Sequence, residues 1–526
     1  MCYISTGKQG CEKHEKKTEG RPGSAAEQAL LNLCHFSFND LCTCSSPAGL
    51  YRNRGLQIYA LPCWNNRFYC SAGASSGGTD AGFRQEKSVF RKPTDKLQLI
   101  SVAALAGYLL FTLISALISP YSSVWLGGQR RDGVLTIGLY ILTALFLMHS
   151  FHPTAWMLHL FGGTMVLFCV LGIIQLTGAN PFHLYPEEYN FYDADRYYAG
   201  EYWSTVGNTD FCGALLSVGA GCFMAALVRR KQQSLSWLAV PLGLIVFSMV
   251  ELRTEAGLVA FIAGLLLLPP LIVTGVKDLY RLLQTYGLIS FCAFAGQLIH
   301  FEDGIVRLVF PTPIFLAGAV FLLLLSFLLK IHKVSGFLEK RCLRLWLAGL
   351  MVAVIIFGVL FLCFYDGFSA PFLQQAHELL HGNADPHFGS GRLYIWQNTW
   401  PLVKEHPCFG GGPDTLGLRG IEPFTRYSEE LQIQIISSID AAHNEYLNIL
   451  VNQGAFSLLA YMVFLTLSLI RWCRNFREDS FAVAGAAALF YLIQAFFGIS
   501  IFLTTPYLWL ALATLNKNTA EKENAK

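Results

Sequence analysis

Apolar runs of about 20 residues recur along most of this chain, and a helix of that length crosses the hydrocarbon core of a bilayer. Hydrophobic residues make up 53% of the sequence and charged residues 14%, whereas soluble domains average about a quarter charged residues. The sequence therefore predicts an all-α polytopic membrane protein with about 11–12 transmembrane helices. The expected spans are 97–118, 133–150, 154–177, 209–228, 235–252, 254–275, 285–300, 311–329, 346–365, 444–470, 481–499 and 501–516.

The distribution of Lys and Arg predicts the orientation. With twelve spans and a cytoplasmic N-terminus, 21 of the basic residues from Arg84 onward fall on the cytoplasmic side and nine on the other. Basic residues prefer cytoplasmic loops, so we expect both termini in the cytoplasm. The expected organisation is nine helices in 97–365, one large extracytoplasmic loop in 366–442, three helices in 443–516 and a cytoplasmic tail in 517–526.

Residues 1–90 do not continue this pattern. They contain seven of the 15 Cys residues but no apolar period and no signal-peptide order of charged, apolar and small residues. The pairs Cys42-x-Cys44 and Cys63…Cys70 lack the two-residue spacing of zinc ligands. We interpret this segment as a disordered extension or as sequence upstream of a miscalled start, with a small metal-binding domain as the alternative.

The long loop contains a predicted helix that follows the turn Gly389-Ser-Gly and runs to Glu405. Arg392 lies at its start, beside the free backbone amides of a helix N-terminus, and together they would bind an anion. The alternative is an arginine that contacts lipid headgroups. One apolar face predicts that the helix lies on the bilayer surface or packs on the bundle; its residues are Leu393, Trp396, Trp400 and Val403.

The same loop contains His377-Glu378-Leu-Leu-His381, which matches the zinc-protease pattern of two His residues four apart with a Glu between them. No third ligand follows in a recognisable place, and Gly382 would end the helix at once. A membrane zinc metalloprotease is therefore an alternative that predicts sensitivity to chelators and a requirement for Glu378.

Three other outward-facing segments are candidates. The loop 178–208 is rich in Tyr and carboxylates, which suits either sugar binding or an aromatic belt at the membrane interface. Asn208 follows Gly207 at the head of the next span. Arg253 lies between Glu251 and Glu255, so it is either part of a structural ion pair or a second ligand for an anion.

The segment 440–457 places His443 where the long loop meets a membrane helix. A helix through this segment would put His443 and Gly454 on one face, about three turns apart. Asn444, Asn448 and Asn452 would form a polar stripe, and amides at membrane depth are costly unless they face protein or a water-filled cavity. A titratable imidazole at the mouth of such a cavity predicts a functional site.

The His443-Asn444 pair followed by Gly454 is similar to the His-Asn signature of O-antigen ligases and the related O-antigen polymerases. Arg392…Trp396, with the glycines 410–412 beyond it, resembles the large periplasmic loop of that family. The segments 119–133 and 207–208 also match places where the family has such patterns. The resemblance covers about 97–516 and is strongest from 389 to 457. Ser457 and the sequence around Arg253 depart from the family pattern.

The resemblance implies a glycosyltransferase of the GT-C membrane architecture that needs no metal or cofactor. Such enzymes transfer glycan from a polyprenyl-diphosphate carrier to an acceptor hydroxyl on the outer face of the bacterial plasma membrane, without a nucleic-acid partner. His443 would be the general base, and Arg392 and Arg253 would stabilise the departing diphosphate. The other expected substrate contacts are Asn208, Trp396, Asn444 and Gly454. Ligase and polymerase activities both remain open, and a polytopic transporter is the alternative from another class.

Overall fold

The computed structural model describes residues 96–517 except 129, 186–199, 253, 303–304, 332–341, 369 and 429–432. Several expectations lie outside these residues: the N-terminal segment 1–90, Arg253, most of the Tyr-rich loop and the tail beyond 517. Their predictions stay as stated above.

Every expected span corresponds to a helix of the described chain. The helices are α2 (Lys96–Ile118), α3 (Val134–Ser150), α4 (Ala155–Leu176), α5 (Thr209–Arg229), α6 (Ala239–Leu252), α7 (Glu255–Leu267), α9 (Val276–Leu298), α10 (Pro313–Ile331), α11 (Cys342–Phe364), α14 (Glu445–Arg474), α15 (Asp479–Gln494) and α16 (Thr505–Leu515). Among described residues, seven helices are long and apolar enough to cross a membrane, and four more are apolar but shorter. The prediction of an all-α polytopic membrane protein is confirmed.

Two spans differ from the expectation. The span 254–275 divides into α7 and the short α8 (Pro269–Ile272), because Pro269 and Pro270 cannot continue a regular helix. Helix α9 begins at Val276 rather than at 285. Its first turns contain Asp278 and Arg281, which hydropathy excluded from a span although both are tied to other parts of the bundle.

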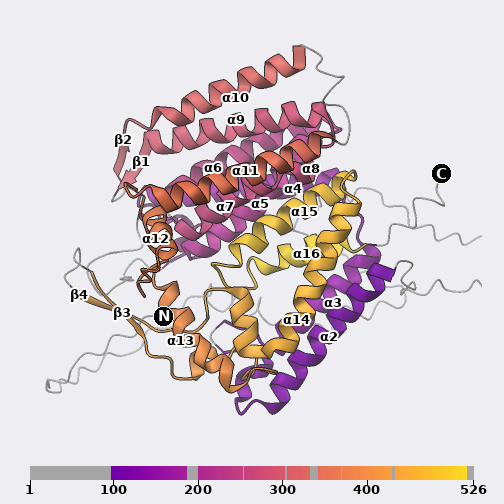
Figure 1. Cartoon of the computed structure of the whole chain (residues 1–526), viewed down its shortest axis with the longest axis vertical. Coiled ribbons are helices and arrows are strands. Elements are labelled where there is room, and N and C mark those ends of the chain that lie inside the picture. The colour runs from indigo at the N-terminus through magenta and orange to yellow at the C-terminus, as the bar shows by residue number, and fades with distance from the viewer. Residues whose placement is uncertain are drawn as a thin grey trace, which may run out of the picture. The chain divides into compact units, whose positions relative to one another are not determined.

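Helix α5 forms the centre of the bundle, and 94% of its apolar window is buried. It packs against α15, α6, α7 and α9. Gly221 allows the closest approach, since a Cβ atom there would lie 2.6 Å from the carbonyl oxygen of Ala486 on α15. By contrast, none of the apolar window of α11 is buried; this helix lies at the front of the bundle in Figure 1 and presents its apolar side chains to the surroundings.

The long loop forms its own small layer at one end of the bundle (Figure 1). Its helix α13 (Arg392–Glu405) contacts α14. The buried residues of α13 are Arg392, Ile395, Thr399 and Val403, whereas Trp400 is 50% exposed, so only part of the predicted apolar face packs on the protein. The remaining elements are α12 (Pro371–Leu380), α13 (Arg392–Glu405), the hairpins β1 (Ile299–Glu302) with β2 (Ile305–Leu308) and β3 (Phe424–Ser428) with β4 (Ile433–Ser437), and the 3-10 turns η2 (Ser122–Trp125), η3 (Pro181–His183), η4 (Gln233–Leu238) and η5 (Leu416–Leu418).

Candidate active site

His443 lies in the loop just before α14, with a left-handed backbone φ of 46°. Asn444 is the N-cap of α14, and its Oδ1 accepts a hydrogen bond of 3.0 Å from the Leu447 amide. The helix is then interrupted at Gly454, whose φ and ψ are 84° and 175°. The expectation that His443 and Gly454 share one helix face is therefore wrong, because the first residue precedes the helix and the second breaks it.

Arg392 at the start of α13 is held by three groups. Its NH2 lies 3.1 Å from Asp210 Oδ2, its Nε donates to the Phe497 carbonyl over 2.9 Å and its NH1 donates to the Gly389 carbonyl over 2.9 Å. The side chain is only 10% exposed. Because a guanidinium has five N–H donors, two remain for a ligand beyond these contacts with the described chain.

A second arginine, Arg130, lies near His443. Arg130 Nε lies 2.8 Å from Asp440 Oδ2, and its NH2 donates to Asp440 Oδ1 over 2.9 Å. Sequence reasoning did not single out Arg130, Asp210 or Asp440. The available signal was their position next to helix ends, on the face that the charge distribution predicts to lie outside the cytoplasm.

These charges act on the imidazole of His443. Burial lowers its pKa to about 4; Arg392 and Arg130 add to the lowering, while Asp210 and Asp440 oppose it. His443 is therefore neutral at pH 7, with a nitrogen lone pair that can accept a proton.

The rate of any reaction that uses His443 as a base should fall only in strongly acidic solution. Burial lowers the folded-state pKa of His443 to about 4, so protonation of the free protein inactivates it as the pH falls through that value. We expect the acidic limb of kcat/KM, which reports the free protein, near pH 4. A limb at the ordinary histidine value of about 6.5 would contradict this assignment.

The asparagine stripe faces protein. Asn448 Oδ1 accepts from the Ala442 amide over 3.2 Å, and Asn452 Oδ1 accepts from the Thr415 amide over 3.2 Å. These amides therefore attach the long loop to α14, which removes the cost of burying them at membrane depth.

The break at Gly454 accommodates the glycine-rich turn 410–412. The Gly411 and Gly412 amides donate to the carbonyls of Val451 and Asn452 over 3.2 and 2.8 Å. A Cβ atom on Gly454 would lie 2.3 Å from the Cys408 carbonyl oxygen. The backbone of the long loop therefore packs directly against α14 at Gly454.

An apolar groove of about 630 Å³ lies next to the histidine, between α13 and the first turns of α14. Trp396 lines it and donates from Nε1 to the Ala442 carbonyl over 3.0 Å, directly before His443. Trp400 and Phe496 are also part of the wall.

Asn208 does not line this groove. It is the N-cap of α5, and its side chain accepts a hydrogen bond from the Phe211 amide. This places Asp210 in the first turn of α5.

A second titratable group lies in the turn 119–133. Burial raises the pKa of Asp132 to about 8, with repulsion from Asp414 and Glu445 adding to it. Asp132 borders a polar cavity of about 20 Å³, which has room for about one water. At the cavity wall, Glu445 accepts from the Tyr461 and Tyr491 hydroxyls over 2.7 and 3.0 Å. Asp132 therefore keeps its proton at neutral pH and could donate it.

The zinc-protease pattern occupies the surface helix α12. Nδ1 of His377 contacts the Leu362 carbonyl at 2.7 Å, and Nδ1 of His381 contacts the His377 carbonyl at 2.8 Å. Glu378 accepts from the side-chain amides of Gln374 and Asn383. Within the described ranges, no group of three His, Cys, Asp or Glu residues could hold a metal ion.

We expect His381→Ala to change the activity of the purified protein by less than about twofold, because its contact is to its own helix. A zinc enzyme would lose its activity on this change. The measurement is the activity of the purified variant beside the wild type, each with and without a chelator.

Residues 312–462 match a protein-family model described as O-antigen ligase. This part of the chain is similar to the O-antigen ligase family. The resemblance seen in the sequence is confirmed over this range, which runs from the start of α10 into α14 and includes both Arg392 and His443. No curated protein matches the chain.

The O-antigen ligase match points to an enzyme of the glycan ligase or polymerase type in a multi-pass membrane protein. The structure adds residues outside the matched range to the same place. Arg130 from the α2–α3 turn acts electrostatically on His443, and Asp210 from α5 pairs with Arg392.

Proposed function

We propose that this protein transfers glycan from a polyprenyl-diphosphate carrier to an acceptor hydroxyl on the extracytoplasmic face of a bacterial plasma membrane. The observation that carries the proposal is the position of a neutral His443 beside the guanidinium of Arg392, inside the range that matches the O-antigen ligase model. The pair supplies a base and a cation at one place, and the transfer of a glycan from a diphosphate needs both.

In the proposed reaction, His443 accepts the proton of the acceptor hydroxyl as that oxygen attacks the anomeric carbon. The bond from this carbon to the diphosphate oxygen breaks, and the diphosphate leaves on the carrier. A neutral imidazole suits this role because the lone pair of one ring nitrogen is free to accept the proton.

The leaving diphosphate develops negative charge, which Arg392 stabilises through the two N–H donors that its protein contacts leave. The carboxylate of Asp210 orients this guanidinium and offsets its charge before the donor binds. Arg253 stays a proposed second ligand of the diphosphate. Asn208, Asn444 and Gly454 support the site by fixing the α5 and α14 ends and the loop.

The apolar groove beside His443 suits the first isoprenoid units of the carrier. Its walls include Trp396, Trp400 and Phe496, and the exposed face of Trp400 continues toward the surface. An apolar chain in this groove would place its diphosphate beside the Arg392 and His443 side chains.

The acceptor decides between two activities of the same chemistry. A lipid or cell-wall hydroxyl would make the protein a ligase, and a second carrier-linked glycan would make it a polymerase of repeat units. A transporter, the alternative from another class, does not need the neutral base and the cation at one site.

The test is an assay with the purified full chain, a polyprenyl-diphosphate glycan and a set of acceptors. We expect the glycan to move to one class of acceptor with release of carrier diphosphate. Release of no diphosphate with any donor and acceptor pair, together with movement of the intact donor across a proteoliposome membrane, would favour the transporter.

A further inference from the structure

A second cavity lies at the other end of the bundle from His443. Helix α5 reaches both places: Asp210 in its first turn contacts Arg392, and Arg229 at its end borders the cavity. The 21 residues of this helix span about 30 Å. The cavity has a volume of about 530 Å³, within the range of about 300–1,000 Å³ that is usual for ligand sites.

The wall of this cavity is mainly apolar and is made by the ends of α4, α5, α15 and α16. Its inner side chains include Phe161, Val218, Cys222, Ala487 and Tyr507. Leu160 on α4 and Leu510 on α16 also line it while they are 62% and 37% exposed. The cavity therefore opens sideways, onto a surface of the bundle that contacts lipid chains.

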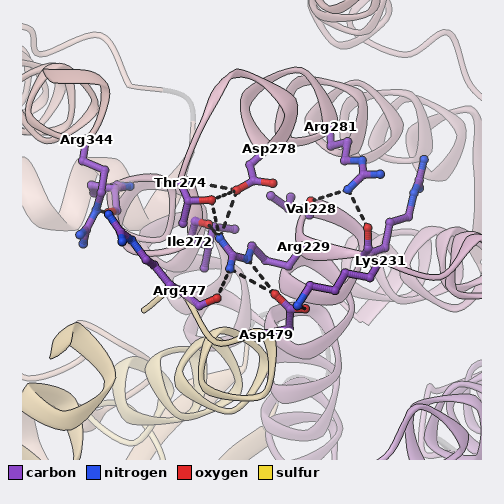
Figure 2. Close-up of polar contacts among 12 residues, drawn as sticks. Val228, Arg229, Lys231, Ile272, Thr274, Asp278, Arg281, Arg344, Arg477 and Asp479 are labelled. Atoms are coloured by element: carbon purple, nitrogen blue, oxygen red, sulfur yellow. Dashed lines mark hydrogen bonds and ion pairs between the residues drawn. The ribbon is translucent and has the colours of Figure 1, made fainter. Parts of the chain in front are cut away.

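Arg229 at the cavity rim is fully engaged with the protein (Figure 2). Its NH1 lies 3.2 Å from Asp278 Oδ2 and its NH2 lies 3.1 Å from Asp479 Oδ1. Figure 2 shows the guanidinium between these acids and the Arg477 carbonyl, to which NH2 also donates. This arginine holds α5, α9 and α15 together, and its charge is offset by its partners.

The next two residues leave positive charge at the rim. Lys231 reaches Asp479 Oδ2 at 2.9 Å but its side chain is 79% exposed, so it also meets solvent. Arg230 lines the cavity, forms no ion pair with the described chain, and its Nε is buried without a hydrogen-bond partner. Burial, followed by repulsion from Arg281, lowers the pKa of this guanidinium, as expected for a cation without an anion nearby.

We propose that this cavity binds an anionic phospholipid of the adjacent leaflet, with an acyl chain against the apolar wall of the cavity and the phosphate on Arg230 and Lys231. The sideways opening gives an acyl chain access from the membrane. The uncompensated charge selects an anionic headgroup, since the guanidinium of Arg230 forms no ion pair with the described chain. A soluble ligand of the same charge would leave the apolar wall unfilled.

The first test titrates the purified full chain in detergent with phosphatidylglycerol or phosphatidylcholine and counts bound lipid by native mass spectrometry. We expect preferential binding of phosphatidylglycerol. The double variant R230A/K231A should bind it at least about tenfold more weakly, because each basic side chain near an anionic lipid is worth about fivefold in affinity.

The matched control is K277A/R474A, which removes two exposed basic residues from the same end of the bundle, neither of which lines the cavity. It should retain wild-type affinity within about twofold. Equal weakening by both double variants, or equal binding of the two lipids by the wild type, would overturn the proposal.

A second pair of variants tests the acyl-chain site in the cavity without changing the charge of the protein. Thr164 lines the cavity from an exposed position on α4, whereas Leu167, one turn later, does not line it and is 73% exposed. Thr164→Trp should obstruct the acyl chain and weaken phosphatidylglycerol binding, and Leu167→Trp should not. Unchanged binding in both would overturn the placement. Displacement of phosphatidylglycerol by an equal concentration of a polyprenyl monophosphate would overturn the assignment to a phospholipid.

Discussion

Replacing His443 by alanine is expected to abolish glycan transfer while the protein still inserts in the membrane and purifies normally. The loss should be on the order of 10²–10⁴-fold, the usual contribution of a positioned base. His443 is half-buried in a loop before α14 and does not cap or interrupt the helix, so its removal leaves the bundle intact. The measurement is the transfer rate of purified variant and wild type, together with lipid-linked glycan in cells, which should accumulate.

His406→Ala is the matched control, because this histidine lies in the same long loop and is exposed. It should transfer glycan at the wild-type rate. Transfer by His443→Ala at a rate within tenfold of the wild type, or normal glycan profiles in cells, would contradict the role of His443 as the base.

Arg392→Ala is also expected to abolish transfer, but it removes structural contacts as well. It leaves Asp210 without its partner and frees the Gly389 and Phe497 carbonyls. The double variant R392A/D210A separates the two effects, because it removes the uncompensated carboxylate. If Arg392 contacts the diphosphate, the double variant should recover thermal stability and not transfer. Recovery of both thermal stability and glycan transfer would show that Arg392 is a purely structural residue.

The helices could be predicted because hydropathy is local information. Each apolar run specifies a span by its own composition, and so all twelve expected spans correspond to helices. The start of α9 was placed wrongly because long-range contacts decide this boundary. Asp278 and Arg281 belong to α9 because they pair with Arg229 and with the carbonyl of Arg230, and these partners lie about 50 residues away in sequence.

The site was predictable only in part. His443 and Arg392 stood out because each is a polar residue at a loop boundary, and the resemblance selected the same two. Three further charged residues did not stand out, because the local sequence does not reveal that segments far apart in the chain meet at one place. They are Arg130, Asp210 and Asp440. The polar stripe was visible, but its function in attaching the loop depends on Thr415 and Ala442, whose amides carry no sequence signal.

Gly454→Ala is expected to prevent the protein from reaching its folded state. The φ and ψ of 84° and 175° lie in a region that is essentially restricted to glycine, at a cost of about 1–3 kcal/mol for another residue. The added Cβ would also lie 2.3 Å from the Cys408 carbonyl oxygen and 2.4 Å from Phe409 Cα. Both are backbone atoms of the loop, so no side-chain rotation relieves the contact, and the loop would have to leave α14.

The measurement is the monodisperse fraction and the thermal midpoint of the detergent-solubilised variant. Gly349→Ala on α11 is the matched control, since a Cβ there meets no atom within 4 Å, and alanine favours a helix by about 0.5–1 kcal/mol. We expect Gly349→Ala to be as stable as the wild type or more so. A folded, fully stable Gly454→Ala protein would mean that the turn 410–412 is not packed on α14. The loop would then lack the attachment that brings Arg392 to His443.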